Sequence, residues 1–323
     1  MEFSSRTILN AYKVLDGEKL EEKEALALIE TGAPYLMDLY SLADKVRRKY
    51  CKESFMTCGI TNAKSGACSE NCSFCAQSAH NPTGIKTYPL KSADDILNDA
   101  RKAKSDGAES FCLVLSGRGY EKPDEEFLRI LDTVTKVIQE TGLELHVSPG
   151  ILSDETAKML KNAGVSAVNH NIETAPSYFH KVCTTHSAAR RILTVRAVKK
   201  AGMKACCGGI IGLGEGPRER VEMALALNDI NVDIIPLNIL RKIEGTAAKS
   251  DTLSIREILN TIAVFRLVNP GRIIKIAAGR ESALEDYQGL AFHAGANGML
   301  IGGYLTLGGR SPEKDKRLIE SLD

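Results

Sequence analysis

Three cysteines lie within eight consecutive residues of this chain, separated first by three residues and then by two. They belong to the segment Lys64-Ser-Gly-Ala-Cys-Ser-Glu-Asn-Cys-Ser-Phe-Cys-Ala-Gln-Ser78. Thiolates on one short loop can ligate three corners of a single iron–sulfur cube, whereas ferredoxins use four cysteines. A loop with three cysteines leaves one iron open to another ligand. We therefore predict that Cys68, Cys72 and Cys75 bind an open-site iron–sulfur cluster.

Zinc is the alternative metal for this loop. Structural zinc sites have four Cys or His ligands, usually presented as paired Cys-x-x-Cys or Cys/His halves. Here only Cys72 and Cys75 have the spacing of such a half. The spacing favours the cluster, and colour separates the two hypotheses, because a barrel that holds zinc for binding alone would be colourless.

Composition excludes several classes of protein. The 323 residues are 43% apolar and carry a formal net charge of +1. They can bury one large core or two domains, and this charge gives no reason to expect a nucleic-acid partner. The apolar runs are shorter than a membrane span, and the first residues do not resemble a signal peptide. Nine cysteines, an odd number, indicate metal binding in a reducing compartment rather than a disulfide framework. We therefore expect a cytoplasmic protein without a membrane partner.

Short apolar runs alternate with amphipathic segments from about residue 55 onward. About eight such units over roughly 250 residues predict an α/β fold, a (β/α)8 TIM-type barrel. A doubly wound sheet is the alternative, but the Rossmann glycine fingerprint is missing after the first strand. The residues before the barrel have helical spacing, so we predict an N-terminal helical cap over 1–50 and a barrel domain over 51–323. The expected strands are Phe55–Ile60, Ser110–Leu115, Glu144–Ser148, Ala167–Asn171, Lys204–Ile211, Ile234–Leu240, Ile273–Ala277 and Gly298–Ile301, and the expected helices lie near 93–106, 123–141, 154–163, 186–201, 216–229, 254–268, 282–293 and 312–321.

Residues capable of chemistry recur on the expected strands. Such barrels carry their sites at the C-terminal ends of the strands, so these side chains are expected to form one central site. Successive side chains of a strand face opposite sides, so Cys206 and Cys207 cannot both point inward without a bulge. Cys112 lies between Phe111 and Leu113, so its default interpretation is a small buried hydrophobic side chain rather than a ligand. The same interpretation applies to Cys58 and Cys206. The residues in question are Cys112, His146, Asn169, Asn171, Cys206, Cys207, Asn238 and Lys275.

Two loops provide polar or backbone groups. The segment Gly208-Gly-Ile-Ile-Gly-Leu-Gly-Glu215 follows a strand but lacks the Lys-Ser/Thr of a Walker loop. Its glycines suit a close backbone approach to an adenosine-bearing ligand, which makes Gly208, Gly209 and Ile210 candidate contacts. In Asn169-His-Asn-Ile-Glu173 the alternate residues would share one face of a strand. Buried polar groups need partners, and a bound polar ligand or internal hydrogen bonds would supply them.

Longer segments around these residues resemble a known family. The cysteine triplet is the signature of the radical S-adenosylmethionine (SAM) enzymes, and the chain resembles the biotin synthase family over roughly residues 50–320. The segments that carry the resemblance are Asn62–Ser78, Val168–Thr174, Cys183–Thr185, Cys207–Glu215, Pro236–Asn238, Ala278–Glu281 and Ala294–Asn297.

The resemblance implies the cofactors and the reaction. SAM would chelate the open iron of a [4Fe–4S] cluster, and its reductive cleavage would give a 5′-deoxyadenosyl radical that abstracts hydrogen from dethiobiotin. A second, auxiliary iron–sulfur cluster would then supply sulfur to form biotin. The family also implies a homodimer and an electron donor such as flavodoxin or ferredoxin. The alternative is another radical SAM enzyme of this barrel group that acts on a different small substrate without inserting sulfur.

The resemblance also assigns roles to single residues. Asn171 matches an asparagine near substrate and SAM, and Glu173 stands where the family usually has an aspartate for the ribose hydroxyls. Arg191 matches an arginine near the methionyl end of SAM, and Asn238 one near the ureido ring of dethiobiotin.

The auxiliary cluster is where this chain departs from its relatives. Better-studied members hold a [2Fe–2S] cluster with three cysteines and an arginine from the second, third, fifth and seventh strands. The chain keeps Cys112 and Cys206 but has His146 and Lys275 at the other two positions, and lysine does not replace arginine as a ligand. We therefore expect a retained but altered cluster, either [2Fe–2S] or larger. Its further ligands would come from Cys58, Cys183, Cys207, His146 or Lys275.

Overall fold

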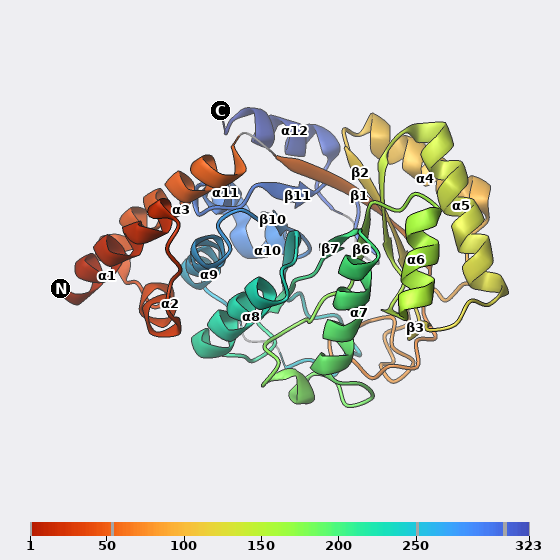
Figure 1. Ribbon diagram of the computed structural model, residues 1–323, viewed down its shortest axis with the longest axis horizontal. Coiled ribbons are helices and arrows are strands. Elements are labelled where there is room, and N and C mark those ends of the chain that lie inside the picture. Colours follow the sequence, from red (N-terminus) through yellow and green to blue (C-terminus); the bar gives the residue numbers. More distant parts are fainter. Residues whose placement is uncertain (1, 53–54, 250–251, 306–308, 323) are drawn as a thin grey trace.

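Eight parallel strands close into a barrel in the computed structural model, which describes residues 2–52, 55–249, 252–305 and 309–322. The ring is closed where Met56 of the first strand pairs with Gly298 of the last. The expected (β/α)8 fold is therefore confirmed (Figure 1). In order around the ring, the strands are β1 (Met56–Lys64), β2 (Ser110–Leu115), β4 (Glu144–Ser148), β6 (Ala167–Asn169), β7 (Lys204–Cys206), β9 (Ile234–Ile239), β10 (Ile273–Ile276) and β11 (Gly298–Leu300).

Helices cover the outside of the ring, and most of them start at a capping side chain. Ser92, for example, accepts a hydrogen bond from the backbone N–H of Asp95, and Asp124 accepts one from Phe127. Such caps satisfy amide groups that the first helical turn leaves unpaired, and each contributes about 1 kcal/mol. The helices of the barrel are α4 (Ala93–Ser105), α5 (Glu125–Thr141), α6 (Asp154–Asn162), α7 (Ala188–Lys200), α8 (Pro217–Asp229), α9 (Ile255–Val268), α10 (Arg280–Leu284), α11 (Gln288–His293) and α12 (Pro312–Glu320).

The N-terminal helices α1 (Glu2–Ala11), α2 (Glu22–Ile29) and α3 (Leu36–Cys51) pack beside α8 and α9 at one end of the molecule (Figure 1). Their contact with the barrel includes buried hydrogen bonds as well as apolar side chains. Tyr40 donates to Oδ1 of Asn260 at 2.9 Å, and Nδ2 of Asn260 donates to the carbonyl of Ile29 at 3.0 Å. Because these polar groups are buried, each bond fixes the register of the extension on α9.

Several elements differ from the expectation. β1 runs to Lys64, four residues past its expected end at Ile60. β6 ends at Asn169, two residues early, because the chain then turns to a left-handed residue at Glu173 (φ 67°). The fifth strand divides into β7 and the short β8 (Gly209–Ile211), where Gly208 packs against the carbonyl of Pro236. The helix expected near 282–293 is interrupted at Glu285, which also has a positive φ of 45°, so it becomes α10 and α11.

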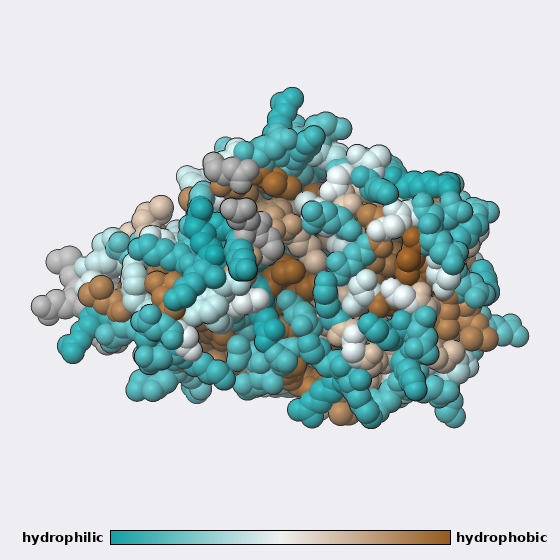
Figure 2. Space-filling model, turned by 45° about the horizontal axis from the view of Figure 1, so that its top comes forward, coloured by the Kyte–Doolittle hydropathy of each residue, from teal (hydrophilic) through white to brown (hydrophobic). Residues whose placement is uncertain are grey.

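Two further short strands, β3 (Gly119–Tyr120) and β5 (Ile151–Leu152), pair outside the ring. On the face shown in Figure 2, hydrophilic residues predominate and hydrophobic residues show mainly in recesses between them. Within the described ranges, no helix combines the length and the apolar character needed to cross a membrane.

Candidate functional site

A cavity of about 340 Å³ opens at the C-terminal ends of the barrel strands. It is lined by the loop after β1, by residues at the ends of β2, β4 and β6 and just after them, and by residues of β8, β9 and β10. The lining includes most of the expected site residues, namely Cys68, Cys72, Cys75, Asn169, Asn171, Glu173, Arg191, Ile210, Asn238 and Lys275.

The cysteine loop is held by backbone hydrogen bonds that leave its sulfurs facing the cavity. The backbone of Cys68 is bonded on both sides, from its N–H to Gln77 O (3.1 Å) and from Ala79 N–H to its carbonyl (2.8 Å). The side-chain amide of Asn81 donates to the carbonyls of Cys72 (3.1 Å) and Cys75 (2.9 Å). The loop is therefore preorganised around three sulfur donors that line one cavity, a donor set that suits an iron–sulfur cluster.

The surroundings of Cys72 and Cys75 favour the protonated thiol over the thiolate. Burial raises the pKa of Cys75 to about 11. A hydrogen bond with Cys183, together with burial, raises the pKa of Cys72 well above its ordinary value. Because a metal is ligated by the thiolate, iron has to displace these protons on binding.

Asn171, Glu173 and Arg191 form one hydrogen-bonded network in the wall of this cavity. Nη1 of Arg191 donates to the carbonyl of Asn171 at 2.8 Å and lies 3.3 Å from Oε1 of Glu173. Nδ2 of Asn171 lies 3.4 Å from Oε2 of the same carboxylate. Burial raises the pKa of Glu173, although the charge of Arg191 acts against this shift. The three residues thus present amide, carboxylate and guanidinium groups to the cavity, a set that can recognise a polar zwitterionic ligand.

The glycine-rich segment holds the backbone of Glu173 in place through hydrogen bonds. Glu173 N–H donates to Gly208 O (3.2 Å), and Ile210 N–H donates to Glu173 O (2.8 Å). Asn238 spans the next strand, with Nδ2 donating to Gly209 O at 3.2 Å. Of the segment Gly208–Ile210, the side chain of Ile210 reaches the cavity lining, while the two glycines allow the backbones to approach closely.

A second group of candidate ligands lies deeper in the barrel. Cys58, Cys112 and Cys206, on β1, β2 and β7, are fully buried, and Lys275 on β10 is 2% exposed. Burial alone would lower the pKa of Lys275, but the three neighbouring sulfurs raise it above its ordinary value. In return, Lys275 and His146 outweigh the effect of burial on Cys58 and lower its pKa to about 6. Lys275 also lines the cavity, so the two groups of candidate ligands adjoin.

Unpaired polar atoms surround this deeper group. Oδ1 of Asn169 is buried without a hydrogen-bond partner among the described residues, and the ring nitrogens of His146 have none within 3.5 Å, although Nε2 lies 3.6 Å from Oε1 of Glu144. Nδ2 of Asn169 lies 3.2 Å from Sγ of Cys112. A buried polar group without a partner costs free energy, so these atoms suit contact with a polar group bound among them. The thiols together with these atoms fit an auxiliary iron–sulfur cluster.

The remaining two candidate cysteines lie elsewhere. Cys207 packs in the main hydrophobic core, on the opposite side of the strand from Cys206, which contacts Met56 and Ile234. Cys183 packs beside Cys72 and Phe179 at the mouth of the barrel. The structure therefore brings Cys58 to the deeper group and keeps Cys183 and Cys207 apart from it.

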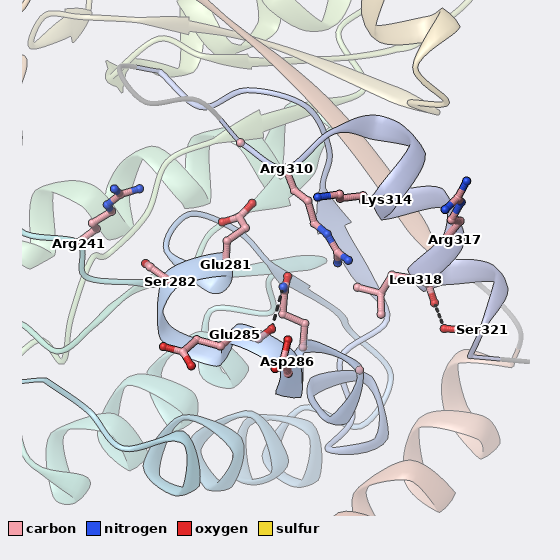
Figure 3. Close-up of a pocket in the computed structure, with 13 residues that line it drawn as sticks. Arg241, Glu281, Ser282, Glu285, Asp286, Arg310, Lys314, Arg317, Leu318 and Ser321 are labelled. Atoms are coloured by element: carbon pink, nitrogen blue, oxygen red, sulfur yellow. Dashed lines mark hydrogen bonds between the residues drawn. The ribbon is translucent and has the colours of Figure 1, made fainter.

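Two more hollows adjoin the site. A cavity of about 260 Å³, lined largely by apolar side chains, runs from Cys75 and Asn238 past Tyr304 to Arg241. Arg241 also borders an outer cleft of about 840 Å³. In that cleft Arg310, Lys314 and Arg317 lie on the α12 side, opposite Glu281, Glu285 and Asp286 (Figure 3).

Sequence reasoning missed two residues of the site, Glu70 and His186. Glu70 lies between two cysteines of the triplet, and His186 follows Thr185 in the segment that carries the family resemblance. Their side chains are 7% and 4% exposed and contact each other. The available signal was a charged residue inside a ligand loop, but nothing in the sequence paired it with a histidine 116 residues away.

Comparison with known proteins agrees with this geometry. The family model of the radical SAM superfamily matches residues 63–227, and that of the biotin and thiamin synthesis associated domain matches residues 236–323. The biotin synthase of Citrifermentans bemidjiense is 43% identical over 313 residues, which cover 97% of this chain and 95% of that protein. The biotin synthase of Chlorobium limicola is 44% identical over 324 residues, which cover 98% of this chain and 96% of that protein.

The chain belongs to the biotin synthase family of radical SAM enzymes. Membership in this family implies a [4Fe–4S] cluster, SAM and an auxiliary iron–sulfur cluster, so the zinc alternative is set aside. Among solved structures, methylornithine synthase shares the fold with a TM-score of 0.80 at 23% identity over 96% of this chain and 95% of that one. The FeFe-hydrogenase maturase of Carboxydothermus hydrogenoformans superposes with a TM-score of 0.82 at 18% identity, over 99% of this chain and 78% of that one.

Proposed function

We propose that this chain is a biotin synthase, which inserts sulfur into dethiobiotin to form biotin. One observation carries the proposal: Lys275 lines the cavity of the cysteine triplet, and its ammonium also lies in the electrostatic field of three buried thiols, with a hydrogen bond to Cys58. A barrel that only cleaved SAM would need the first set of ligands and not the second.

The chain's own residues would orient the cofactors and exclude water. When bound, the [4Fe–4S] cluster and SAM supply the radical chemistry, and the auxiliary cluster supplies the sulfur. Cys68, Cys72 and Cys75 would hold the first cluster. Asn171 and Glu173 would bind polar groups of SAM, because both residues line the cavity. Arg191 holds the backbone carbonyl of Asn171 and the carboxylate of Glu173, and the N–H of Gly208 donates to Oδ1 of Asn171.

We infer that Cys112, Cys206 and Cys58 hold the auxiliary cluster, with His146 and Lys275 next to it. The three sulfurs near Lys275 and the buried imidazole of His146 beside Cys58 support this set. Histidine can replace cysteine as a ligand in Rieske-type centres. The burial of Lys275 supports a hydrogen-bond donor to a cluster sulfur rather than a ligand, since its ammonium has no lone pair to offer.

The substrate would occupy the space between the two clusters and extend into the second cavity. Asn238 lines both cavities, which suits an amide that faces the ureido ring. The apolar walls suit the aliphatic chain of dethiobiotin, and Arg241 at the far end suits its carboxylate.

The partners and location follow from the same proposal. The reaction needs a one-electron donor, for which flavodoxin or ferredoxin is the chemical class, and the family expectation is a homodimer. The free thiols of the candidate ligands support a reducing compartment such as the cytoplasm.

The proposed function is tested with anaerobically purified chain, reconstituted with iron and sulfide. Dethiobiotin, SAM and a reduced flavodoxin are added, and biotin and 5′-deoxyadenosine are quantified. Biotin formation is expected. Production of 5′-deoxyadenosine without any biotin would overturn sulfur insertion and favour a radical SAM enzyme with another substrate.

The nuclearity of the auxiliary cluster is tested separately. Iron and sulfide analysis with Mössbauer spectroscopy is expected to give more iron than one cube per chain. Iron for a single cube, in protein whose SAM-binding cluster is fully loaded, would refute a two-cluster enzyme.

A further inference from the structure

A buried carboxylate and a buried imidazole meet behind the cysteine loop. Oε2 of Glu70 lies 2.5 Å from Nδ1 of His186, and the hydroxyl of Thr185 donates to the same oxygen. On its outer side, the other carboxylate oxygen lies 3.7 Å from the half-exposed Arg118. A contact this short between two nearly buried side chains is a fixed feature of the site rather than a surface pairing.

The other nitrogen of His186 sets the direction of the hydrogen bonds. Nε of Arg191 donates to Nε2 of His186 at 2.8 Å. Arginine has donors and no acceptor, so Nε2 must be the acceptor, and the imidazole proton lies on Nδ1 and points to Glu70. Glu70, His186 and Arg191 therefore form a relay with a single polarity, in which the carboxylate fixes the imidazole and the imidazole fixes the guanidinium.

The far end of the relay is at the cluster loop. Nη2 of Arg191 lies 3.9 Å from Sγ of Cys72, and Nη1 contacts Glu173. The ring of Phe179 packs against both the guanidinium, 5.5 Å from its centroid, and the imidazole, at 5.4 Å between centroids. The guanidinium is thus clamped by an aromatic ring and by the relay, with one edge directed at a sulfur.

We propose that Glu70 and His186 are positioning residues that hold the Arg191 guanidinium against the Cys72 sulfur and thereby set the reduction potential of the cluster on that loop. The inference rests on the proposed function only in taking Cys72 as a cluster ligand. Reduction adds negative charge to the cluster, so a cation and N–H donors at its sulfur stabilise the reduced form and raise the potential. Without His186, Nε of Arg191 loses a buried acceptor and the guanidinium moves to find another.

Three variants separate the relay from general packing. His186→Asn removes the acceptor for Arg191, whereas His186→Gln places an amide oxygen near the position of Nε2 and keeps that acceptor. Glu70→Gln keeps the shape of the carboxylate and removes its charge. His80→Gln is the matched control, because His80 is exposed and its ring bonds to Ser69 O on the same loop, at 3.0 Å, away from the relay.

The readout is the midpoint potential of the reconstituted full-length protein, followed by EPR, for the cluster whose signal changes when SAM is added. H186N is expected to move the potential to more negative values and to raise the KM for SAM about tenfold. E70Q and H186Q, which weaken the contact between residues 70 and 186 but keep an acceptor for Arg191, are expected to shift the potential and the KM in the same direction by less, while H80Q keeps wild-type values.

An unchanged potential in both H186N and E70Q would overturn the relay, as would an equal shift in H80Q. If H186N fails to load its cluster, E70Q alone decides, because its side chain is isosteric. These potentials are measured on the cluster itself. If the wild-type enzyme makes no biotin, the proposed function is contradicted. The inference about the relay is still decided by the measured potentials.

Discussion

The carboxylate of Glu173 lies 3.3 Å from Nη1 of Arg191, on a residue whose backbone is left-handed, with φ of 67°. A side chain with a Cβ seldom adopts this conformation, which costs of order 1 kcal/mol. It persists because Gly208 O accepts the N–H of Glu173 and Ile210 N–H binds its carbonyl. The local strain is therefore maintained by the strand beside it and directs the carboxylate into the cavity.

Shortening or neutralising this carboxylate should weaken the binding of SAM. Glu173→Asp suits the left-handed backbone better but withdraws the charge from Arg191, so we expect a KM for SAM raised about tenfold with normal cluster content. Glu173→Gln keeps the reach and loses the ion pair, and a similar rise is expected. SAM titrations and iron analysis check both variants. A wild-type KM in both would show that Glu173 does not contact the cofactor.

The close approach at Gly209 predicts a steric effect on the same wall. A Cβ there would lie 2.5 Å from the carbonyl oxygen of Glu173 and 2.6 Å from Sδ of Met223, so Gly209→Ala must push the Glu173 loop away. We expect at least tenfold weaker SAM binding and a lower melting temperature. Gly271→Ala is the control, since its added Cβ would meet open space. Equal SAM affinity in the two variants would contradict the role of this glycine.

The fold was predictable because each barrel unit repeats a local pattern. β2 and β4 have the bounds expected from their apolar runs, and Ser92 and Asp124 mark helix starts by caps that are visible in the sequence. Asn171 was expected on a strand, but β6 ends at Asn169. The side chain of Asn171 instead accepts a hydrogen bond from the backbone N–H of Gly208. No propensity within the segment itself indicates that turn.

The site was predictable to the extent that strand alternation determines it. The two-residue period puts Cys206 and Cys207 on opposite faces, which is how they lie. This period does not predict contacts between distant loops, such as that between Glu70 and His186, which are 116 residues apart in the sequence. The pairing depends on how the loop after β1 (Met56–Lys64) folds over the end of β6, which no single segment encodes.

Cys58 provides a test of the auxiliary ligand set. Cys58→Ala removes a buried sulfur that contacts Lys275, so we expect the loss of the auxiliary cluster and of biotin formation, while cleavage of SAM to 5′-deoxyadenosine continues. Cys207→Ala is the matched control, because Cys207 packs in the core on the other side of the sheet. Iron content and Mössbauer spectra check the outcome. Loss of the auxiliary cluster in C207A but not in C58A would reverse the assignment.

Arg241 provides a test of the substrate orientation. It lines the apolar cavity beyond Asn238, so Arg241→Ala should raise the KM for dethiobiotin about fivefold, which corresponds to about 1 kcal/mol for an exposed ion pair. With the methyl ester of dethiobiotin, which has no charge to bind, the variant and the wild type should have equal KM values. Lys242→Ala is the control, since that exposed neighbour does not line the cavity. A KM for dethiobiotin that is the same in R241A and K242A would argue against this orientation.

The last helix depends on an ion pair that no solvent reaches. Nη2 of Arg280 lies 2.8 Å from Oδ2 of Asp315, and both side chains are 0% exposed, which joins α10 to α12 beside the charged cleft. Asp315→Ala would remove the buried counter-charge of this guanidinium and leave only the partly exposed Glu281, at 3.4 Å, so we expect destabilisation of about 3 kcal/mol, measured by denaturant unfolding. Lys316→Ala, on the exposed side of the same helix, should change stability by less than about 0.5 kcal/mol.

Because breaking a buried pair costs more than the pair itself contributes, the double change Arg280→Met with Asp315→Leu should recover much of the loss. A double variant as unstable as D315A would instead mean that the hydrogen bond from Arg280 to Gln288 (2.5 Å) carries the contact.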